Sequence, residues 1–106
     1  LSFGGQVDYI DNSVSTHVYY IIREAAFNAA RHGEPDTIEI TMRTESSAIF
    51  VQIVDDGNGF DPSSARKGMG LHTIEYRAKA IGATFSLESD WQRGTTITVS
   101  GEIEIQ

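Results

Sequence analysis

One segment of this 106-residue chain constrains its fold more than any other: the stretch from Asp55 to Leu71. It holds two glycine clusters, DDGNGF at 55–60 and GMGL at 68–71, joined by a short polar connector that includes PSSARK. Such clusters place free backbone N–H groups along a loop, and they let the backbone approach a ligand closely. The stretch therefore predicts a loop that serves a binding site and joins two regular elements.

The residues on either side of this loop define those elements. The apolar, β-branched run at 48–54 predicts a strand with both faces largely covered. After the loop, apolar residues recur at helical spacing until Gly82, which predicts a helix over 71–81. The positive end of this helix and the loop amides would face one cavity, which favours an anion such as a phosphate.

Hydrophobic periodicity predicts the other elements and the fold class. We expect a short edge strand within 1–9, a helix from Ser13 to His32 capped by Asp11 or Asn12, and strands over 38–43, 85–88 and 96–105. Consecutive strands joined by tight turns are antiparallel. The order β-α-β-β-α-β-β therefore predicts a two-layer α/β sandwich with a mixed, mostly antiparallel sheet covered on one face by helices.

Composition limits the function classes. The length corresponds to one domain over 1–106, and the chain has the look of a piece cut from a longer protein. No cysteine is present, which excludes disulfide scaffolds and thiolate metal sites. The formal charge of −7 argues against direct binding of nucleic acid, but one nucleotide can still be held by Mg²⁺ and backbone amides.

The first predicted helix carries a polar stripe beside its apolar face. Glu24, Asn28 and His32 are spaced four residues apart and so project from one side of the helix, next to Arg31. Pairs of this kind are often merely exposed polar residues. Asn is unfavourable in the interior of a helix, however, which indicates another reason for Asn28 to be there. Its carbonyl oxygen suits Mg²⁺. Glu24 could orient or deprotonate a nucleophile or a metal-bound water.

Asp55 is the second candidate. Taken alone, an Asp followed by Gly57 and Gly59 is more typical of an ordinary turn. The functional alternative places its carboxylate at the mouth of a pocket, where it can only accept hydrogen bonds and so selects an amino-bearing base over a keto one.

Taken in order, four segments resemble the ATP-binding catalytic domain of sensor histidine kinases, in the larger family shared with gyrase, Hsp90 and MutL. REAAFNAARHG at 23–33 is similar to the family's N box, DDGNGF to its first glycine box and GMGL to its second. GTTITV at 94–99 is similar to its closing Gly-Thr strand. The short connector and GLHTIEYRAKAIGA at 70–83 look most like the NarL/DesK-type kinases.

The resemblance implies a Bergerat-type ATP-binding fold with ATP and Mg²⁺ as cofactors. Asn28 would coordinate Mg²⁺, with Glu24 assisting the metal or the attacking group, and Asp55 would hold the adenine amine. The remaining expected contacts with ATP are Arg31, His32, Gly57, Gly59, Lys67, Gly68, Gly70, Leu71 and Thr95. Lys67 is our own inference rather than a motif position.

The resemblance also implies partners. The γ-phosphoryl group would pass to a histidine on a separate dimerisation domain that this chain lacks, and then to a response regulator, usually of the helix-turn-helix class. The parent would be a homodimer and the isolated domain a monomer. We expect a cytoplasmic domain, in a parent that is either free or membrane-anchored.

Two rival functions remain open from the sequence. One keeps the fold but changes the acceptor, as in an anti-sigma-factor Ser/Thr kinase, whose N box also tends to place His-Gly after the Asn. The other is a non-catalytic module that only senses nucleotide or binds a protein. Mg²⁺-strengthened nucleotide binding would argue against the second rival, and a phosphorylatable histidine just before Leu1 would argue against the first.

Overall fold

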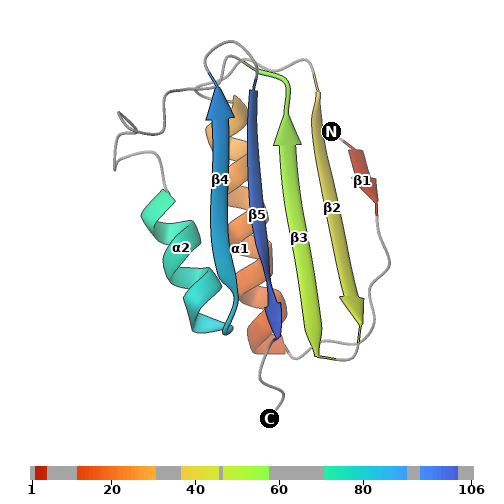
Figure 1. Ribbon diagram of the computed structural model, residues 1–106, viewed down its shortest axis with the longest axis vertical. Coiled ribbons are helices and arrows are strands. Elements are labelled where there is room, and N and C mark those ends of the chain that lie inside the picture. The colour runs from red at the N-terminus through yellow and green to blue at the C-terminus, as the bar shows by residue number, and fades with distance from the viewer. Residues whose placement is uncertain are drawn as a thin grey trace.

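A computed structural model describes residues 2–4, 12–30, 37–45, 47–57, 71–90 and 94–102 of the chain. Its elements follow the predicted order (Figure 1). They are β1 (Ser2–Gly4), α1 (Asn12–Asn28), β2 (Ile38–Glu45), β3 (Ala48–Asp55), α2 (Leu71–Ala80), β4 (Thr84–Asp90) and β5 (Gly94–Glu102).

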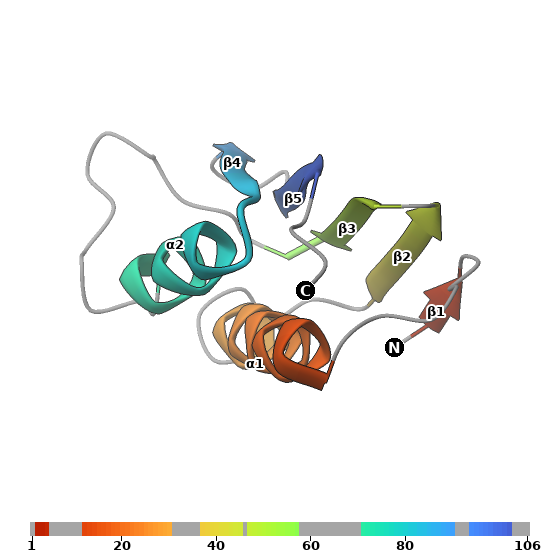
Figure 2. The same ribbon diagram turned by 90° about the horizontal axis from the view of Figure 1, so that it is seen from below.

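The strands form one five-stranded sheet in the order β1-β2-β3-β5-β4. β1 pairs in parallel with β2, and the remaining neighbours are antiparallel. Seen from below, α1 and α2 lie on the same side of the sheet (Figure 2). The predicted two-layer α/β sandwich with a mixed, mostly antiparallel sheet is confirmed.

Helix α1 packs one apolar stripe against the sheet. Val14, Val18, Ile21 and Ala25 are buried, at the spacing of one helical face. The helix begins at Asn12, one residue before the predicted start, and the Asn12 carbonyl oxygen accepts a hydrogen bond of 2.8 Å from the hydroxyl of Thr16. It ends at Asn28 and continues as a wider π-helical turn at 29–30, while the predicted end at His32 lies outside the described residues.

The hairpin of β2 and β3 has one buried and one open face. In β3 the residues Ile49, Val51 and Ile53 are buried, whereas Phe50 and Val54 between them are only half-buried. The prediction that both faces of this strand are covered is therefore wrong. The helices cover one face only, and the alternation of β-strand side chains exposes the other.

Helix α2 ends in the glycine stop that its sequence predicts. Gly82 has a φ of 80°, and its N–H donates to the carbonyl of Lys79 at 3.0 Å. The Ala83 N–H donates to the carbonyl of Ala78 at 2.9 Å. These two bonds form a Schellman cap, which returns the chain directly into β4.

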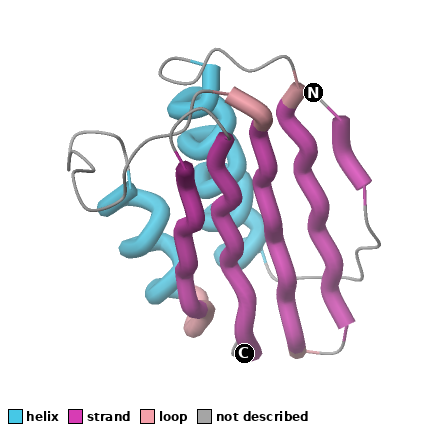
Figure 3. The backbone as a smooth tube through the Cα atoms, turned by 45° about the horizontal axis from the view of Figure 1, so that its top comes forward, coloured by secondary structure: helices cyan, strands magenta, loops and turns pink. Residues whose placement is uncertain are grey.

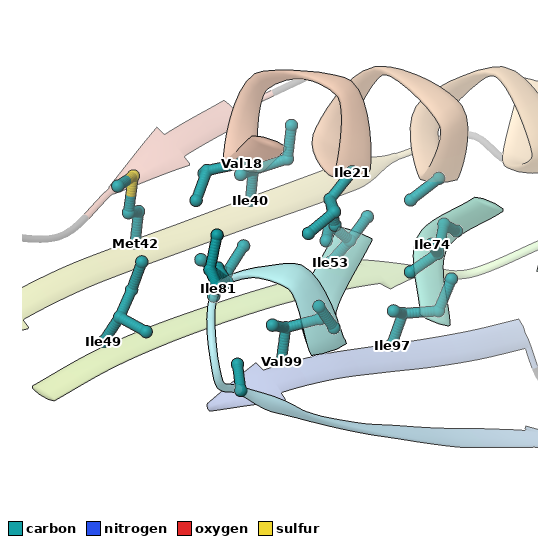
Figure 4. Close-up of a cluster of buried hydrophobic side chains, with 14 of the residues drawn as sticks. Val18, Ile21, Ile40, Met42, Ile49, Ile53, Ile74, Ile81, Ile97 and Val99 are labelled. Carbon is teal, nitrogen blue, oxygen red and sulfur yellow. The ribbon is translucent and has the colours of Figure 1, made fainter. Parts of the chain in front are cut away.

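The core lies between the two layers and draws on both helices and on β2, β3 and β5, with the half-buried Phe85 and Leu87 of β4 packed against it (Figure 4). Its fully buried larger side chains are Ile21, Ile53, Ile74, Val51 and Val99. α2 also contacts α1 away from the sheet, where the Arg77 guanidinium lies 4.3 Å from the centre of the Tyr20 ring. Strand β4 is longer than predicted at both ends. Strand β5 begins two residues earlier than predicted and ends at Glu102, and the predicted continuation to 105 lies outside the described residues.

Candidate functional site

Several elements have their termini at one end of the domain. There α1 ends, β3 ends and β5 begins, as the tracing in Figure 1 and the tube in Figure 3 both show. The elements that carry Asn28, Asp55 and Thr95 therefore reach the same end, although these residues are far apart in the sequence.

Asp55 is the last residue of β3 and is buried, with 8 % of its surface exposed. The backbone N–H of Gly57 donates to Asp55 Oδ1 at 2.9 Å. The next residue, Asp56, is exposed and accepts a hydrogen bond of 2.9 Å from the backbone N–H of Thr37. This contact ties the end of β3 to the residue before β2. Asp55 is thus part of a local turn and is buried at the same time.

The electrostatic environment of Asp55 disfavours its ionised form. Removal from water raises the pKa of this carboxyl above its ordinary value, and the negative charge of Asp56 raises it further. The backbone hydrogen bonds from Gly57 and Thr95 act in the opposite direction and lower the pKa. A hydrogen-bond donor brought by a ligand would stabilise the carboxylate in addition, since its two oxygens can accept about four hydrogen bonds.

Gly94 brings the start of β5 against Asp55. Its φ is 101°, and a Cβ built on it would lie 2.1 Å from the backbone oxygen of Asp55. Only glycine fits there without displacing that carbonyl group. This close approach was not predicted, although a glycine directly before a Thr-rich strand and after a turn was visible in the sequence.

Thr95 lies opposite Asp55 in the pairing of β3 with β5, and opposite Ser89 in the pairing of β4 with β5. The hydroxyls of Ser89 and Thr95 are 2.8 Å apart. Ser89 is buried and was not singled out from the sequence. An open hollow of about 170 Å³ borders this end of the sheet, lined by Val54, Asp55, Glu88, Ser89, Gly94, Thr95 and Thr96.

Glu24 and Asn28 occupy the last turns of α1. Both are half-buried and flank the buried Ala25 and Ala29, so the predicted polar stripe borders the core. The amide oxygen of Asn28 and the carboxylate of Glu24 are hard oxygen donors, which suit Mg²⁺. Among the residues that the structure describes, no three His, Asp or Glu side chains gather as a metal-binding cluster.

The other predicted contacts divide into two groups. Leu71 is the first residue of α2, half-buried against the core. The predictions for Arg31, His32, Gly59, Lys67, Gly68 and Gly70 fall outside the described residues.

A family model supports the interpretation of the motifs. Residues 13–104 match the family described as histidine kinase-, DNA gyrase B- and HSP90-like ATPase. The match covers most of the chain, and the chain therefore belongs to this family of ATP-binding domains.

Individual relatives are histidine kinases. The chain is 32% identical over 91 residues to the oxygen sensor histidine kinase NreB of Staphylococcus carnosus, a match that covers 84% of this chain and 26% of the relative. The chain thus spans about a quarter of the length of this curated relative. Within the described residues, no helix is long and apolar enough to span a membrane.

Solved structures share the fold. The blue-light activated histidine kinase of Erythrobacter litoralis matches with a TM-score of 0.73 at 16% identity, over 96% of this chain and 35% of that one. The ATP binding domain of PrrB from Mycobacterium tuberculosis matches with a TM-score of 0.70 at 19% identity, over 85% of this chain and 69% of that one. At such identities these matches establish the fold alone.

Proposed function

We propose that this chain is the ATP-binding catalytic domain of a sensor histidine kinase, one domain of a longer protein. The observation that carries the proposal is the buried carboxylate of Asp55, which ends a central strand beside Gly94 and Thr95. A buried acceptor-only group at a strand end recognises a ligand that brings a donor, such as the exocyclic amine of adenine. Gly57 holds the carboxylate in place through its N–H.

The other end of the bound nucleotide would extend toward α1. Asn28 and Glu24 present oxygen donors at the helix end that reaches the same end of the domain as Asp55. We propose that Asn28 binds Mg²⁺ directly and that Glu24 acts through the metal or on the attacking group. Phosphate contacts stay predictions for Arg31, His32 and Lys67, and a backbone cradle for the phosphates stays one for Gly68 and Gly70. Gly59 stays a prediction for close approach of the backbone to the base, and Leu71 for a contact with ATP.

The chemistry proposed is transfer of a phosphoryl group to a histidine. The γ-phosphoryl group would come from ATP, which leaves as ADP, and bound Mg²⁺ would neutralise the charge of the phosphates. The residues of this chain contribute positioning: Asp55 fixes the base, and Asn28 and Glu24 fix the metal end, so that one phosphate faces the acceptor. The acceptor histidine would belong to a dimerisation domain of the parent protein, and a response regulator would receive the group from it.

The test is calorimetric titration of the chain with ATP, ADP and GTP, each with and without Mg²⁺. We expect adenine-selective binding that Mg²⁺ strengthens. Asp55→Asn should abolish it, because the amide replaces one acceptor oxygen with a donor that opposes the adenine amine. Asp56→Asn is the matched control, since Asp56 is exposed and next in the chain, and it should leave binding nearly unchanged.

Asn28→Ala separates the two ends of the site. This variant should still bind adenosine. Two properties should be lost: the strengthening of ATP binding by Mg²⁺, and phosphoryl transfer to the acceptor histidine. Phosphoryl transfer that survives Asn28→Ala would show that the metal assignment is wrong. Absence of nucleotide binding by the unaltered chain at millimolar concentrations would instead favour an interaction module with the same fold.

A further inference from the structure

Ser89 is a buried polar residue on a strand at the edge of the sheet. Its exposed fraction is 7 %, and it shares this end of the sheet with Asp55, another buried polar residue. Its hydroxyl lies 3.3 Å from the backbone oxygen of Gly94 and 2.8 Å from the hydroxyl of Thr95. Buried hydroxyls are usually hydrogen-bonded for structural reasons, but both partners here belong to the segment that contacts Asp55.

Strand register places three side chains in one row. Asp55 pairs with Thr95 across β3 and β5, and Thr95 pairs with Ser89 across β5 and β4. Residues directly opposite each other project to the same face, with Cβ atoms about 4.5–5.5 Å apart. Thr95, Ile97 and Val99 are every second residue of β5 and so project to one face of the sheet. That face is the one covered by the helices, because Ile97 and Val99 are buried. Ser89 is therefore the outer member of a row whose inner member is Asp55.

We propose that Ser89 is a positioning residue for the base end of the nucleotide, acting through Thr95. The inference rests on the function proposed above. Either hydroxyl can donate in the 2.8 Å contact between Ser89 and Thr95. We assign that proton to Thr95, because the single Ser89 hydroxyl proton is placed to reach the Gly94 carbonyl. The Thr95 oxygen can then only accept a hydrogen bond from a ligand, as the Asp55 carboxylate does. The row of Asp55, Thr95 and Ser89 would therefore offer a ligand acceptors and no donor.

A row of acceptors favours a base with an amine at the recognised edge over one with a keto group there. ATP and ITP differ in this way: adenine, the base of ATP, has an amino group at position 6, whereas hypoxanthine, the base of ITP, has a keto oxygen there. Removing the Ser89 hydroxyl frees the Thr95 proton to turn toward the ligand. Ser89→Ala should therefore weaken ATP binding about three- to tenfold, the size expected for one hydrogen bond, and should reduce the preference for ATP over ITP.

Thr84 supplies a matched control on the same strand. Its hydroxyl donates to the backbone oxygen of Ser100 at 3.0 Å, so it also joins β4 to β5, but at the opposite end of the pair. Thr84→Ala removes one such bond far from Asp55. Both variants are compared with the unaltered chain by urea unfolding and by titration with ATP and ITP.

A double-mutant cycle tests whether Ser89 acts through Thr95. In a Thr95→Val background, Ser89→Ala should cause no further loss of ATP affinity or of ATP preference, whereas Ser89→Thr, which keeps the hydroxyl, should preserve both in the native background. Equal ATP/ITP preference in Ser89→Ala and the unaltered chain would overturn the inference, as would a full additional loss in the Thr95→Val background. Failure of the unaltered chain to bind ATP would contradict the proposed function itself, and this inference with it.

Discussion

Gly94 gives the most direct test of how the start of β5 shapes the site, and the change is Gly94→Ala. A Cβ at this position would lie 2.1 Å from the Asp55 backbone oxygen, whereas an ordinary contact needs 3.4 Å or more. The two backbone segments must therefore separate by about 1.3 Å, the difference between these two distances, through movement of the Asp55 carbonyl, of residue 94 or of both. Movement of that carbonyl would also move the Asp55 carboxylate, which we propose holds the base, because both groups belong to one residue.

Two costs add up in this variant. A non-glycine residue in the left-handed region costs about 1–2 kcal/mol, and forced overpacking costs about 1–3 kcal/mol. We expect Gly94→Ala to lower the free energy of unfolding by about 2–5 kcal/mol. Gly82→Ala is the control, since its φ is 80° but its built Cβ lies 3.3 Å from the nearest atom, the Glu102 oxygen. It should cost only the first amount, about 1–2 kcal/mol.

The assay is urea unfolding of both variants, with ATP titration of the folded protein under conditions where each is native. Gly94→Ala should lose more stability than Gly82→Ala and should also lose ATP affinity, whereas Gly82→Ala should keep it. Equal losses of stability in the two variants, with ATP affinity unchanged in both, would refute the reasoning that Gly94 is required by the backbone of Asp55.

Two further predictions concern Asp55 and the core. Burial raises the pKa of Asp55 above its ordinary value of 3.8, so the native state binds this proton more tightly than the unfolded chain. The contribution of Asp55 to stability is full below that ordinary value and is lost as the pH rises through the raised pKa. Over this range the free energy of unfolding of the unaltered chain should fall relative to that of Asp55→Asn. A difference between the two in urea titrations that does not change with pH would contradict the raised pKa. Ile74→Ala should cost about 2–5 kcal/mol because Ile74 is 0% exposed between the layers. Tyr76→Ala on the same helix, at 67% exposure, should change stability by less than about 0.5 kcal/mol, and similar losses in the two would contradict the burial.

Local patterns were sufficient to predict most of the fold. The spacing of Val14, Val18 and Ile21 predicted α1, and Gly82 predicted the end of α2, because these signals depend on residues close in sequence. For Asp55 the sequence left two interpretations open, an ordinary turn and a carboxylate at the mouth of a pocket, and the structure shows both a local hydrogen bond from Gly57 and burial of the side chain. The open face of β3 was missed because a run of apolar residues does not reveal whether one layer or two will cover it.

The part of the site that the sequence did not predict depends on which strands pair and in which register. Ser89 is one of two serines on β4, and its importance follows only from its pairing with Thr95. Gly94 is important because its backbone meets Asp55, and that meeting requires the pairing of β3 with β5. Register between strands far apart in sequence is fixed by the assembled sheet, and a single sequence does not give it.

The strand order has a consequence for folding. β5 is the last described strand in the chain, yet it lies between β3 and β4 and hydrogen-bonds to both. Until it inserts, the long edge of β3 is unpaired, and an unpaired edge is open to association with other chains. Insertion of β5 covers that edge and brings Gly94 and Thr95 to Asp55 in one event. A ligand held by these residues would bind only chains that have completed the sheet, and would stabilise them over every earlier intermediate.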